Sequence, residues 1–392
     1  MSENIFSNIN KAFVRELKRI VRDPVYILGT VVVMTFCYVF FLTLFDEGLP
    51  QRMPVAVVDN DNSSLSRQYI RNVDATQLAK VTMHLANYTE ARKEMQKGNV
   101  YAIIVIPHEF ASDLYASRQP KLTFYVNDAY LVAGSLLLKD ITYMSELTAG
   151  AAKQTTLLAK GFEDSRIMGI IQPVNIDTHL IGNPWANYGI YLLNVLLPGI
   201  LQLMILMLTV YAVGTELKLK TSKEWLHNSG DSMLAALTGK ILPYTIIFSV
   251  LGIIADILLY KFMHYPMNAG MTWMIITTIL YVLAYQAMGI LIIGTTPVLR
   301  DGVTLAAFYG LLGFTMAGFT FPIEQLPYPF RIFSEIFPIR HYFEIYVNQC
   351  LNGLPIGYSV AQLLSLVAFL VLPMFVFNRL KKAAIYQHYP IK

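Results

Sequence analysis

The chain has 392 residues, of which 55% are hydrophobic and only 14% are charged. A soluble globular chain carries about 25% charged residues, so the composition excludes an ordinary soluble protein. The net charge of +4 is too small to indicate nucleic-acid binding, and two cysteines, Cys37 and Cys350, are too few for a disulfide framework.

Residues 1–24 are predicted to form an amphipathic helix on the cytoplasmic surface of the membrane. Basic residues occupy the other faces of this helix, which favours an interfacial helix over a spanning one. The apolar positions recur at nearly fourfold spacing, at Phe6, Ile9, Phe13, Leu17 and Val21.

Long apolar runs predict six spanning helices, because a span needs about 20 mostly apolar residues. The first run, residues 25–45, has no charge and is followed by Asp46-Glu47-Gly48 rather than a small-residue cleavage site. We therefore interpret it as a span and not as a signal peptide. The later runs are residues 188–213, 241–260, 272–294, 303–321 and 358–377.

Residues 46–184, between the first two spans, predict a separate α/β domain with a mixed sheet and its own core. The expected strands are 54–59, 80–85, 100–106, 121–126 and 174–180, and the expected helices are 65–71, 89–97, 108–117 and 129–160. Asp59 and Asp61 admit two interpretations, a cation site or a turn that caps the next helix. We find no motif here for a catalytic zinc or a catalytic serine.

Residues 214–231 form a short charged segment after the second span. One interpretation is a solvated loop helix. The other is a helix that docks into a groove of a partner protein, with Trp225 and Leu226 as apolar anchors. The candidate coupling residues are Glu216, Lys218, Lys220, Thr221, Lys223, Glu224, Trp225 and Leu226.

The C-terminal half, residues 185–392, is expected to be a five-helix membrane domain with two further candidate sites. Small residues on the fifth span predict close helix packing, either within the chain or at a subunit interface that lines a pathway. Those residues are Ala306, Gly310, Gly313 and Ala317. Residues 322–352 predict short re-entrant or interfacial helices on the outer side, with a candidate outer gate at Pro322, Glu324, Phe330, Phe333 and Phe337.

The distribution of Lys and Arg predicts the orientation, since cytoplasmic flanks are enriched in both. With both termini cytoplasmic, the short outer loops hold only Lys261, Arg331 and Arg340. The cytoplasmic flanks hold Lys11, Arg15, Lys18, Arg19, Arg22, Lys218, Lys220, Lys223, Lys240, Arg300, Arg379, Lys381, Lys382 and Lys392. Residues 46–184 are then extracytoplasmic.

No phosphate-binding Walker A loop occurs. Its nearest likeness, Thr238-Gly239-Lys240-Ile241, lacks the upstream glycine and the hydroxyl residue after the lysine. We therefore expect no ATP hydrolysis by that route, and no enzymatic activity and no cofactor in this chain.

The sequence resembles the ABC-2 type permeases, in the exporter branch that has a large extracytoplasmic domain between the first two spans. The likeness covers nearly the whole chain. Its motifs are Val57-Val58-Asp59-Asn60-Asp61, Asn183-Pro184 with Asn187-Tyr188, Leu197-Pro198-Gly199, and Phe319-Thr320-Phe321-Pro322-Ile323-Glu324. The family's acidic pattern after the second span is only partly kept, because Leu217, Lys218 and Lys220 replace the second acid and the glycine.

The resemblance implies the permease subunit of an ATP-driven exporter in a bacterial inner membrane. The implied substrate is drug-like, lipid-like or otherwise amphiphilic. The implied partners are an ATP-binding cassette ATPase, a second permease subunit in a homodimer or heterodimer, the lipid bilayer, and a periplasmic adaptor with an outer-membrane channel. The resemblance implies that ATP and Mg²⁺ are bound by the ATPase subunit.

Two alternatives remain open at this stage. One is a membrane-anchored receptor whose extracytoplasmic domain binds a ligand or adaptor. The other is an ion-coupled transporter that uses Asp256, the one acid well inside a predicted span. Internal repeats, which such transporters usually show, are not evident.

Overall fold

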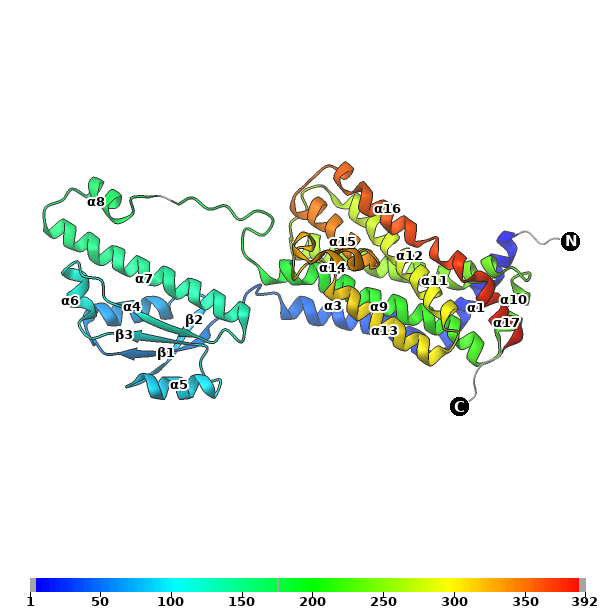
Figure 1. Cartoon of the computed structure of the whole chain (residues 1–392), viewed down its shortest axis with the longest axis horizontal. Helices are drawn as coiled ribbons and strands as arrows, with labels where there is room; N and C mark the ends of the chain where they lie inside the picture. Colours follow the sequence, from blue (N-terminus) through cyan, green and yellow to red (C-terminus); the bar gives the residue numbers. More distant parts are fainter. Residues whose placement is uncertain (1–4, 175, 388–392) are drawn as a thin grey trace. The chain divides into compact units, whose positions relative to one another are not determined.

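The computed structural model describes residues 5–174 and 176–387, which form two compact units (Figure 1). The membrane unit combines the chain up to Asp46 with the chain from Leu180 onward, and the inserted unit is Glu47–His179. The sequence placed this insertion at residues 46–184, within a few residues of the division found.

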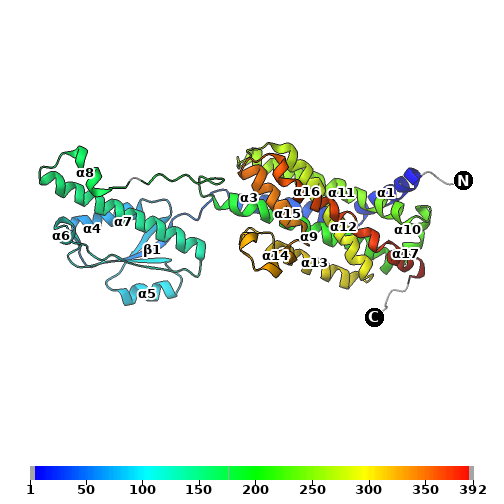
Figure 2. The same ribbon diagram turned by 45° about the horizontal axis from the view of Figure 1, so that its top comes forward.

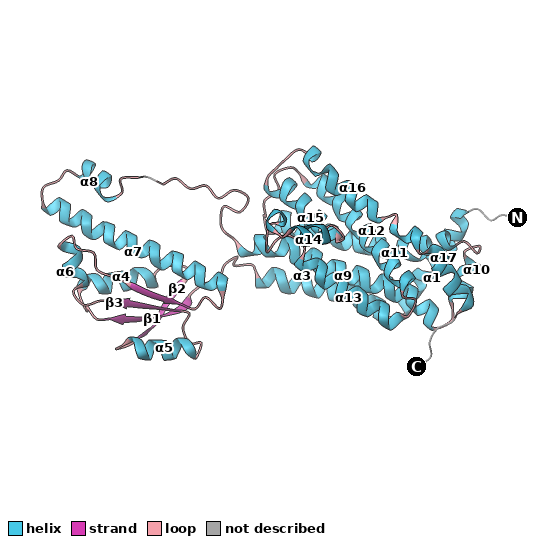
Figure 3. Cartoon of the chain, viewed as in Figure 1, coloured by secondary structure: helices cyan, strands magenta, loops and turns pink. Residues whose placement is uncertain are grey.

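The membrane unit is helical throughout (Figure 3). Its N-terminal part is α1 (Ile5–Arg22), α2 (Pro24–Ile27) and α3 (Val33–Leu44), with a π-helical turn joining α2 to α3. Its second part is α9 (Tyr188–Lys218), α10 (Ser222–Asn228), α11 (Met233–Ile257), α12 (Met271–Thr295), α13 (Leu299–Thr315), α14 (Tyr328–Ser334), α15 (Pro338–Tyr346), α16 (Val360–Phe369) and α17 (Phe377–Tyr386).

Among the described residues, five helical stretches are long and apolar enough to cross a membrane. They are Pro24–Leu44, Tyr188–Lys218, Met233–Phe262, Met271–Thr295 and Ile356–Tyr386. The predicted fifth span is not among them, because α13 has only 17 residues. At 1.5 Å per residue α13 rises about 26 Å, short of a hydrocarbon core of about 30 Å.

Nevertheless, α13 and the residues after it run antiparallel along most of α9. Leu299 packs against Gly214 near the end of α9, and Phe314 packs against Gly199 near its middle. Beyond α13, the Phe319 carbonyl accepts a 3.1 Å hydrogen bond from the Tyr191 hydroxyl at the start of α9. The segment 299–319 therefore follows the full apolar length of a helix that is long enough to span.

The start of α9 explains one motif of the sequence. The Asn187 side chain caps the helix by accepting from the backbone N–H groups of Gly189 and Ile190, at 2.7 and 3.2 Å. Asn183 fixes that cap by donating to the Asn187 carbonyl at 2.8 Å and accepting from its backbone N–H at 3.0 Å. Because an Asn side chain satisfies the free N–H groups of a first turn, this pair sets where α9 begins.

In the inserted unit, a four-stranded sheet has the order β2-β1-β3-β4, with β4 antiparallel to β3 and the other pairs parallel. Its strands are β1 (Met53–Asp59), β2 (Ala79–His84), β3 (Ala102–Ile106) and β4 (Thr123–Val126). Its helices are α4 (Ser64–Asp74), α5 (Tyr88–Gln96), α6 (Phe110–Tyr115), α7 (Leu131–Ala159) and α8 (Asp164–Ile171).

Helices cover both faces of this sheet (Figure 2). Val55 and Val57 face a core shared with α4, α6 and α7, whereas Ala56 and Val58 face a smaller core on the α5 side. Residues of β1 therefore alternate between two apolar environments, which explains why this strand reads as a continuous apolar run.

The last predicted strand, residues 174–180, is wrong for the residues that the structure describes. They form no strand, and α8, which the sequence did not predict, precedes them. Asn175 lies outside the described residues. Val174 and Ile176 are exposed, so the apolar pattern that suggested a strand has no sheet to pair with.

Candidate functional site

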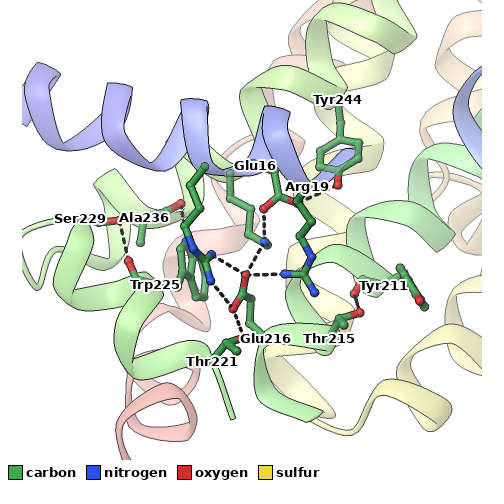
Figure 4. Close-up of polar contacts among 12 residues, drawn as sticks. Glu16, Arg19, Tyr211, Thr215, Glu216, Thr221, Trp225, Ser229, Ala236 and Tyr244 are labelled. Carbon is green, nitrogen blue, oxygen red and sulfur yellow. Dashed lines mark hydrogen bonds and ion pairs between the residues drawn. The ribbon is translucent and has the colours of Figure 1, made fainter. Parts of the chain in front are cut away.

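A cluster of buried charges lies where α1, α9 and α11 meet (Figure 4). The carboxylate of Glu216, in the last turn of α9, is fully buried. It accepts hydrogen bonds from Arg15 at 2.7 and 3.2 Å, from Arg19 at 2.6 Å and from Lys240 at 3.0 Å. The Thr221 hydroxyl donates a further short bond to it.

A second carboxylate completes the cluster. Lys240, which is fully buried on α11, also donates to Glu16 of α1 at 2.5 Å. The other oxygen of Glu16 accepts from the Tyr244 hydroxyl at 2.8 Å. Lys240 thus links the two carboxylates, and the cluster holds three cations against two anions.

The position of α1 follows from this arrangement. Its protein-facing residues recur every fourth position, at Asn8, Ala12, Glu16 and Ile20. The predicted apolar stripe does not face inward, because Phe6, Leu17 and Val21 are exposed. An apolar face left open beside a basic face is what an interfacial helix needs to lie at a membrane surface.

Burial makes the charges interdependent. A buried ion pair is strongly destabilised when one partner is removed, because the other charge is left without compensation. Burial by itself would lower the pKa of the Arg15 guanidinium, but its hydrogen bond to Glu216 and the charge of that carboxylate raise the pKa above its ordinary value. Arg15 therefore remains charged, and α1 stays attached to the end of α9 by ionic contacts.

The short helix α10 is tied to α11 and α17 by side-chain contacts, and Thr221, the residue before it, bonds to Glu216 of α9. Trp225 donates its indole N–H to the Ala236 carbonyl of α11 at 3.2 Å, and Lys240 lies 5.5 Å from its ring centroid. The Ser222 hydroxyl donates to the Ala384 carbonyl of α17 at 2.9 Å. A displacement of α10 would therefore be transmitted to α9, α11 and α17 together.

The structure divides the predicted coupling residues into two groups. Glu216 and Thr221 belong to the ion cluster, and Trp225 and Leu226 are only 1% and 3% exposed. The expected role of Trp225 and Leu226 as anchors in a partner's groove does not fit this burial, since both side chains already pack within the chain. The side chains left at the surface are Lys218, Lys220, Lys223 and Glu224.

Sequence reasoning missed Glu16, Arg15, Arg19 and Lys240 as members of one site. It counted the basic residues as surface charges and treated Thr238-Gly239-Lys240 only as a rejected phosphate loop, whereas these three residues lie inside α11. One signal was available, because Glu16 is the single acid of a basic helix and lies four residues from both Ala12 and Ile20.

The small residues of α13 pack inside the chain and not at a free surface. Ala306, Gly310, Gly313 and Ala317 are all buried. A β-carbon added at Gly310 would lie 2.5 Å from Leu203 of α9, and one at Gly313 would lie 3.1 Å from Phe337. These contacts match the interpretation that the stripe packs within the chain, rather than at a subunit interface. The opposite face of α13 exposes Leu305, Phe308 and Leu311.

The candidate gate residues do not form one group. Pro322, Glu324, Phe330 and Phe333 are exposed around α14, whereas Phe337 is fully buried. The Phe337 ring lies 4.9 Å from that of Tyr309 and 5.2 Å from that of Phe333, centroid to centroid. Phe337 therefore belongs to the core between α13 and α15.

Asp256, the acid of the ion-coupled alternative, lies between α11 and α12. Its carboxylate accepts from the Thr278 hydroxyl at 2.8 Å and from the Tyr342 hydroxyl at 3.4 Å. It is 3% exposed, and no cation in the described part of the chain pairs with it. The described residues also contain no group of three or more His, Cys, Asp or Glu side chains that could hold a metal ion.

A family model described as ABC-2 family transporter protein matches residues 25–378. The chain belongs to the ABC-2 transporter family. This ABC-2 chain is thus a multi-pass membrane protein and a permease component of an ABC transporter, and ABC-2 permeases normally pair with an ATP-binding cassette ATPase. No curated protein matches it.

Proposed function

We propose that this ABC-2 chain is the permease of an ATP-driven exporter, coupled to its ATPase through residues 214–231. The supporting observation is the ion cluster around Glu216, which joins α1, α9 and α11 beside α10. A force applied to α10 or to α1 is carried by charge-assisted bonds into two spanning helices. The exposed charges of Lys218, Lys220, Lys223 and Glu224 provide the contact surface for the ATPase.

In this proposal, the end of the membrane unit that holds the ion cluster around Glu216 is the cytoplasmic end. The lysine and arginine side chains of α1 and of residues 218–223 gather there, and α17 joins them through its contacts with Ser222 and Asp231. With six crossings, counting residues 299–319 as one, both termini are cytoplasmic and the inserted unit is extracytoplasmic. This arrangement satisfies the enrichment of basic residues on the cytoplasmic side.

The export pathway in this proposal lies between two permease subunits and is bordered by α9 and α13. The outward face of α13, with Leu305, Phe308 and Leu311, is the surface we assign to the second permease or to lipid, because the small-residue face is already covered by α9. The substrate is an amphiphile taken from the cytoplasm or the inner leaflet. The inserted unit is the contact for an adaptor and an outer-membrane channel.

The coupling role is tested with charge reversals on the exposed face of α10. The chain is purified from its native membranes together with its ATPase, and ATP hydrolysis and the amount of bound ATPase are measured. Lys223→Glu and Glu224→Lys should each reduce ATPase binding, while the thermal midpoint of the purified chain stays unchanged. Lys93→Glu, an equally exposed charge on α5, is the matched control.

Unchanged ATPase binding and unchanged hydrolysis in both charge-reversal variants would remove α10 as the coupling contact. A loss that the Lys93→Glu control shares would show only a general effect of net charge.

A further inference from the structure

The inserted unit contains a cavity of about 790 Å³ at the carboxyl ends of its parallel strands. Residues at or just after the ends of β1, β2 and β3 line it, namely Asn60, His84 and His108. Residues of α4, including Arg67 and Arg71, form its side. Its volume falls within the range of about 300–1,000 Å³ typical of small-molecule sites.

The topology explains why a cavity forms at this edge. The chain leaves β1 through α4 on one face of the sheet and returns from β2 to β3 through α5 on the other face. The connections therefore diverge on either side of β1. In open sheets of parallel strands, ligands bind in the crevice that such a divergence leaves beyond the carboxyl ends of the strands.

The acidic and basic side chains that line the cavity differ in how many hydrogen-bond partners they have within the chain. Both carboxylates already accept hydrogen bonds within the chain. Asp59 accepts from the backbone N–H groups of Asp61 and Asn62 and from the Ser66 hydroxyl. Asp74 accepts from Lys80 at 3.0 Å and from the Val81 backbone at 2.9 Å.

The basic side chains make far fewer hydrogen bonds within the described part of the chain. Among the described residues, the Arg67 guanidinium makes one hydrogen bond, 2.6 Å long, to the Asn62 carbonyl. Within residues 5–174 and 176–387, the side chains of Arg71, His84 and His108 have no hydrogen bond or ion pair. Several N–H donors therefore face the cavity without an acceptor.

Part of the cavity wall is apolar. Val57 and Ile70 are buried there, and the half-buried side chains of Val81 and Leu85, in β2 and just after it, form the accessible apolar part of the wall. This apolar patch beside the guanidinium groups of Arg67 and Arg71, which keep N–H donors free, suits a molecule that has an apolar body and an anionic group. A guanidinium binds a carboxylate through two parallel N–H···O bonds, so a carboxylate is the matching anion.

We propose that this cavity is a binding site for a small organic acid, held by Arg67 and Arg71 with its apolar body against Val81 and Leu85. The inference concerns the inserted unit alone and does not depend on the permease coupling proposed above. It gives this unit a ligand-binding function in addition to any contact with protein partners.

The test uses the full chain in lipid nanodiscs and a water-soluble photoreactive probe, benzoic acid that carries a trifluoromethyl diazirine. The matching benzyl alcohol has the same apolar body without the charge. After illumination, labelled peptides are identified by mass spectrometry. The acid should label the peptides that contain His84 and Arg71 saturably, and the alcohol should label them far less.

Arg71→Gln should reduce the labelling affinity about tenfold, since a hydrogen bond to a charged group contributes roughly that factor. Arg71→Lys should retain part of the affinity. Arg92→Gln, an exposed arginine on α5 outside the cavity, is the control and should have no effect. Because Arg71 is exposed and makes no side-chain bond, its replacement leaves the fold intact, and the thermal midpoint verifies this.

Equal labelling by acid and alcohol would overturn the proposal. Labelling that does not saturate, or that persists unchanged in Arg71→Gln, would overturn it as well. None of these results depends on an ATPase, so a failure here is separate from a failure of the coupling proposal.

Discussion

The Glu216 carboxylate is buried among three cations that come from two different helices. Glu216 could be predicted as a candidate coupling residue because it follows the second predicted span. Its partners were not predictable, because Arg15 and Arg19 lie about 200 residues away in the sequence and look like ordinary basic residues of an interfacial helix. Only the packing of α1 against α11 brings them together.

We expect Glu216→Gln to destabilise the membrane unit by about 3–5 kcal/mol, because it leaves buried cations without their anion. The measurement is the thermal midpoint of the purified chain, followed by the loss of soluble monodisperse protein on heating. Glu224→Gln, which changes an exposed acid eight residues later, is the matched control and should leave the midpoint unchanged. Equal midpoints for the two variants would show that the cluster contributes no stability.

Gly239 permits the close approach of α1 to α11. A β-carbon at Gly239 would lie 2.5 Å from both the Ala12 β-carbon and the Ile9 carbonyl oxygen. Gly239→Leu should therefore displace α1 and break the contact of Glu16 with Lys240. Overpacking of this kind typically costs about 1–3 kcal/mol.

The readout for Gly239→Leu is the rate of tryptic cleavage after Arg15 and Arg19, which should rise as α1 is released. Thr238→Leu places the same side chain at the neighbouring, exposed position and should leave the rate unchanged. Slow cleavage in both variants would mean that α1 is held by other contacts.

At the scale of elements, apolar runs predicted the long helices well, since their length and composition alone determine them. Length and composition could not predict which neighbours a short helix such as α10, or a stripe of small residues such as that of α13, packs against. α10 has seven residues, and its pattern was compatible with a solvated loop helix or with a helix docked onto a partner. In the structure, Trp225 and Leu226 are instead buried within the chain. The small stripe of α13 likewise fits any close helix neighbour, and α9 occupies it in this chain.

The two faces of α13 should respond differently to substitution. Gly310→Leu should disrupt the contact with Leu203 and lower the thermal midpoint of the single chain, whatever its oligomeric state. Phe308→Ala, on the exposed face, should leave the midpoint unchanged. If α13 contacts a second permease there, Phe308→Ala should also lower the dimeric fraction measured by mass photometry in nanodiscs. A normal midpoint in Gly310→Leu would contradict the packing of this face within the chain.

At the scale of the whole molecule, the alternation of strands and helices in the inserted unit followed from local patterns. Four of the five predicted strands are present, each within two residues of its expected limits. The fifth was wrong because an apolar segment needs a neighbouring strand edge to become a strand, and a sequence pattern does not say whether one is free. The cavity of the inserted unit could not be predicted from the sequence either. Its position depends on the order of the strands in the sheet and on which face of the sheet each connecting helix covers.

The number of crossings decides on which side of the membrane the later segments lie. In cysteine-free protein, single cysteines at Thr89, His227 and Tyr358, all exposed, are treated with an impermeant thiol reagent in intact cells. With residues 299–319 as a crossing, Thr89 and Tyr358 should react and His227 should not. If residues 299–319 turn back, Tyr358 should be protected while Thr89 still reacts.

Reaction at His227 in intact cells would contradict the proposed orientation as a whole. Permeabilised cells, in which all three cysteines should react, provide the control for accessibility.

The ion pair between Glu16 and Lys240 joins residues that are 224 positions apart. A ribosome adds about 5–20 residues per second, so Glu16 is added to the chain roughly 10–45 s before Lys240. During that interval α1 can rest on the membrane surface, but its carboxylate has no lysine to accept from. The N-terminal helix can be seated only after α11 has been inserted, which makes the first segment synthesised one of the last to reach its final position.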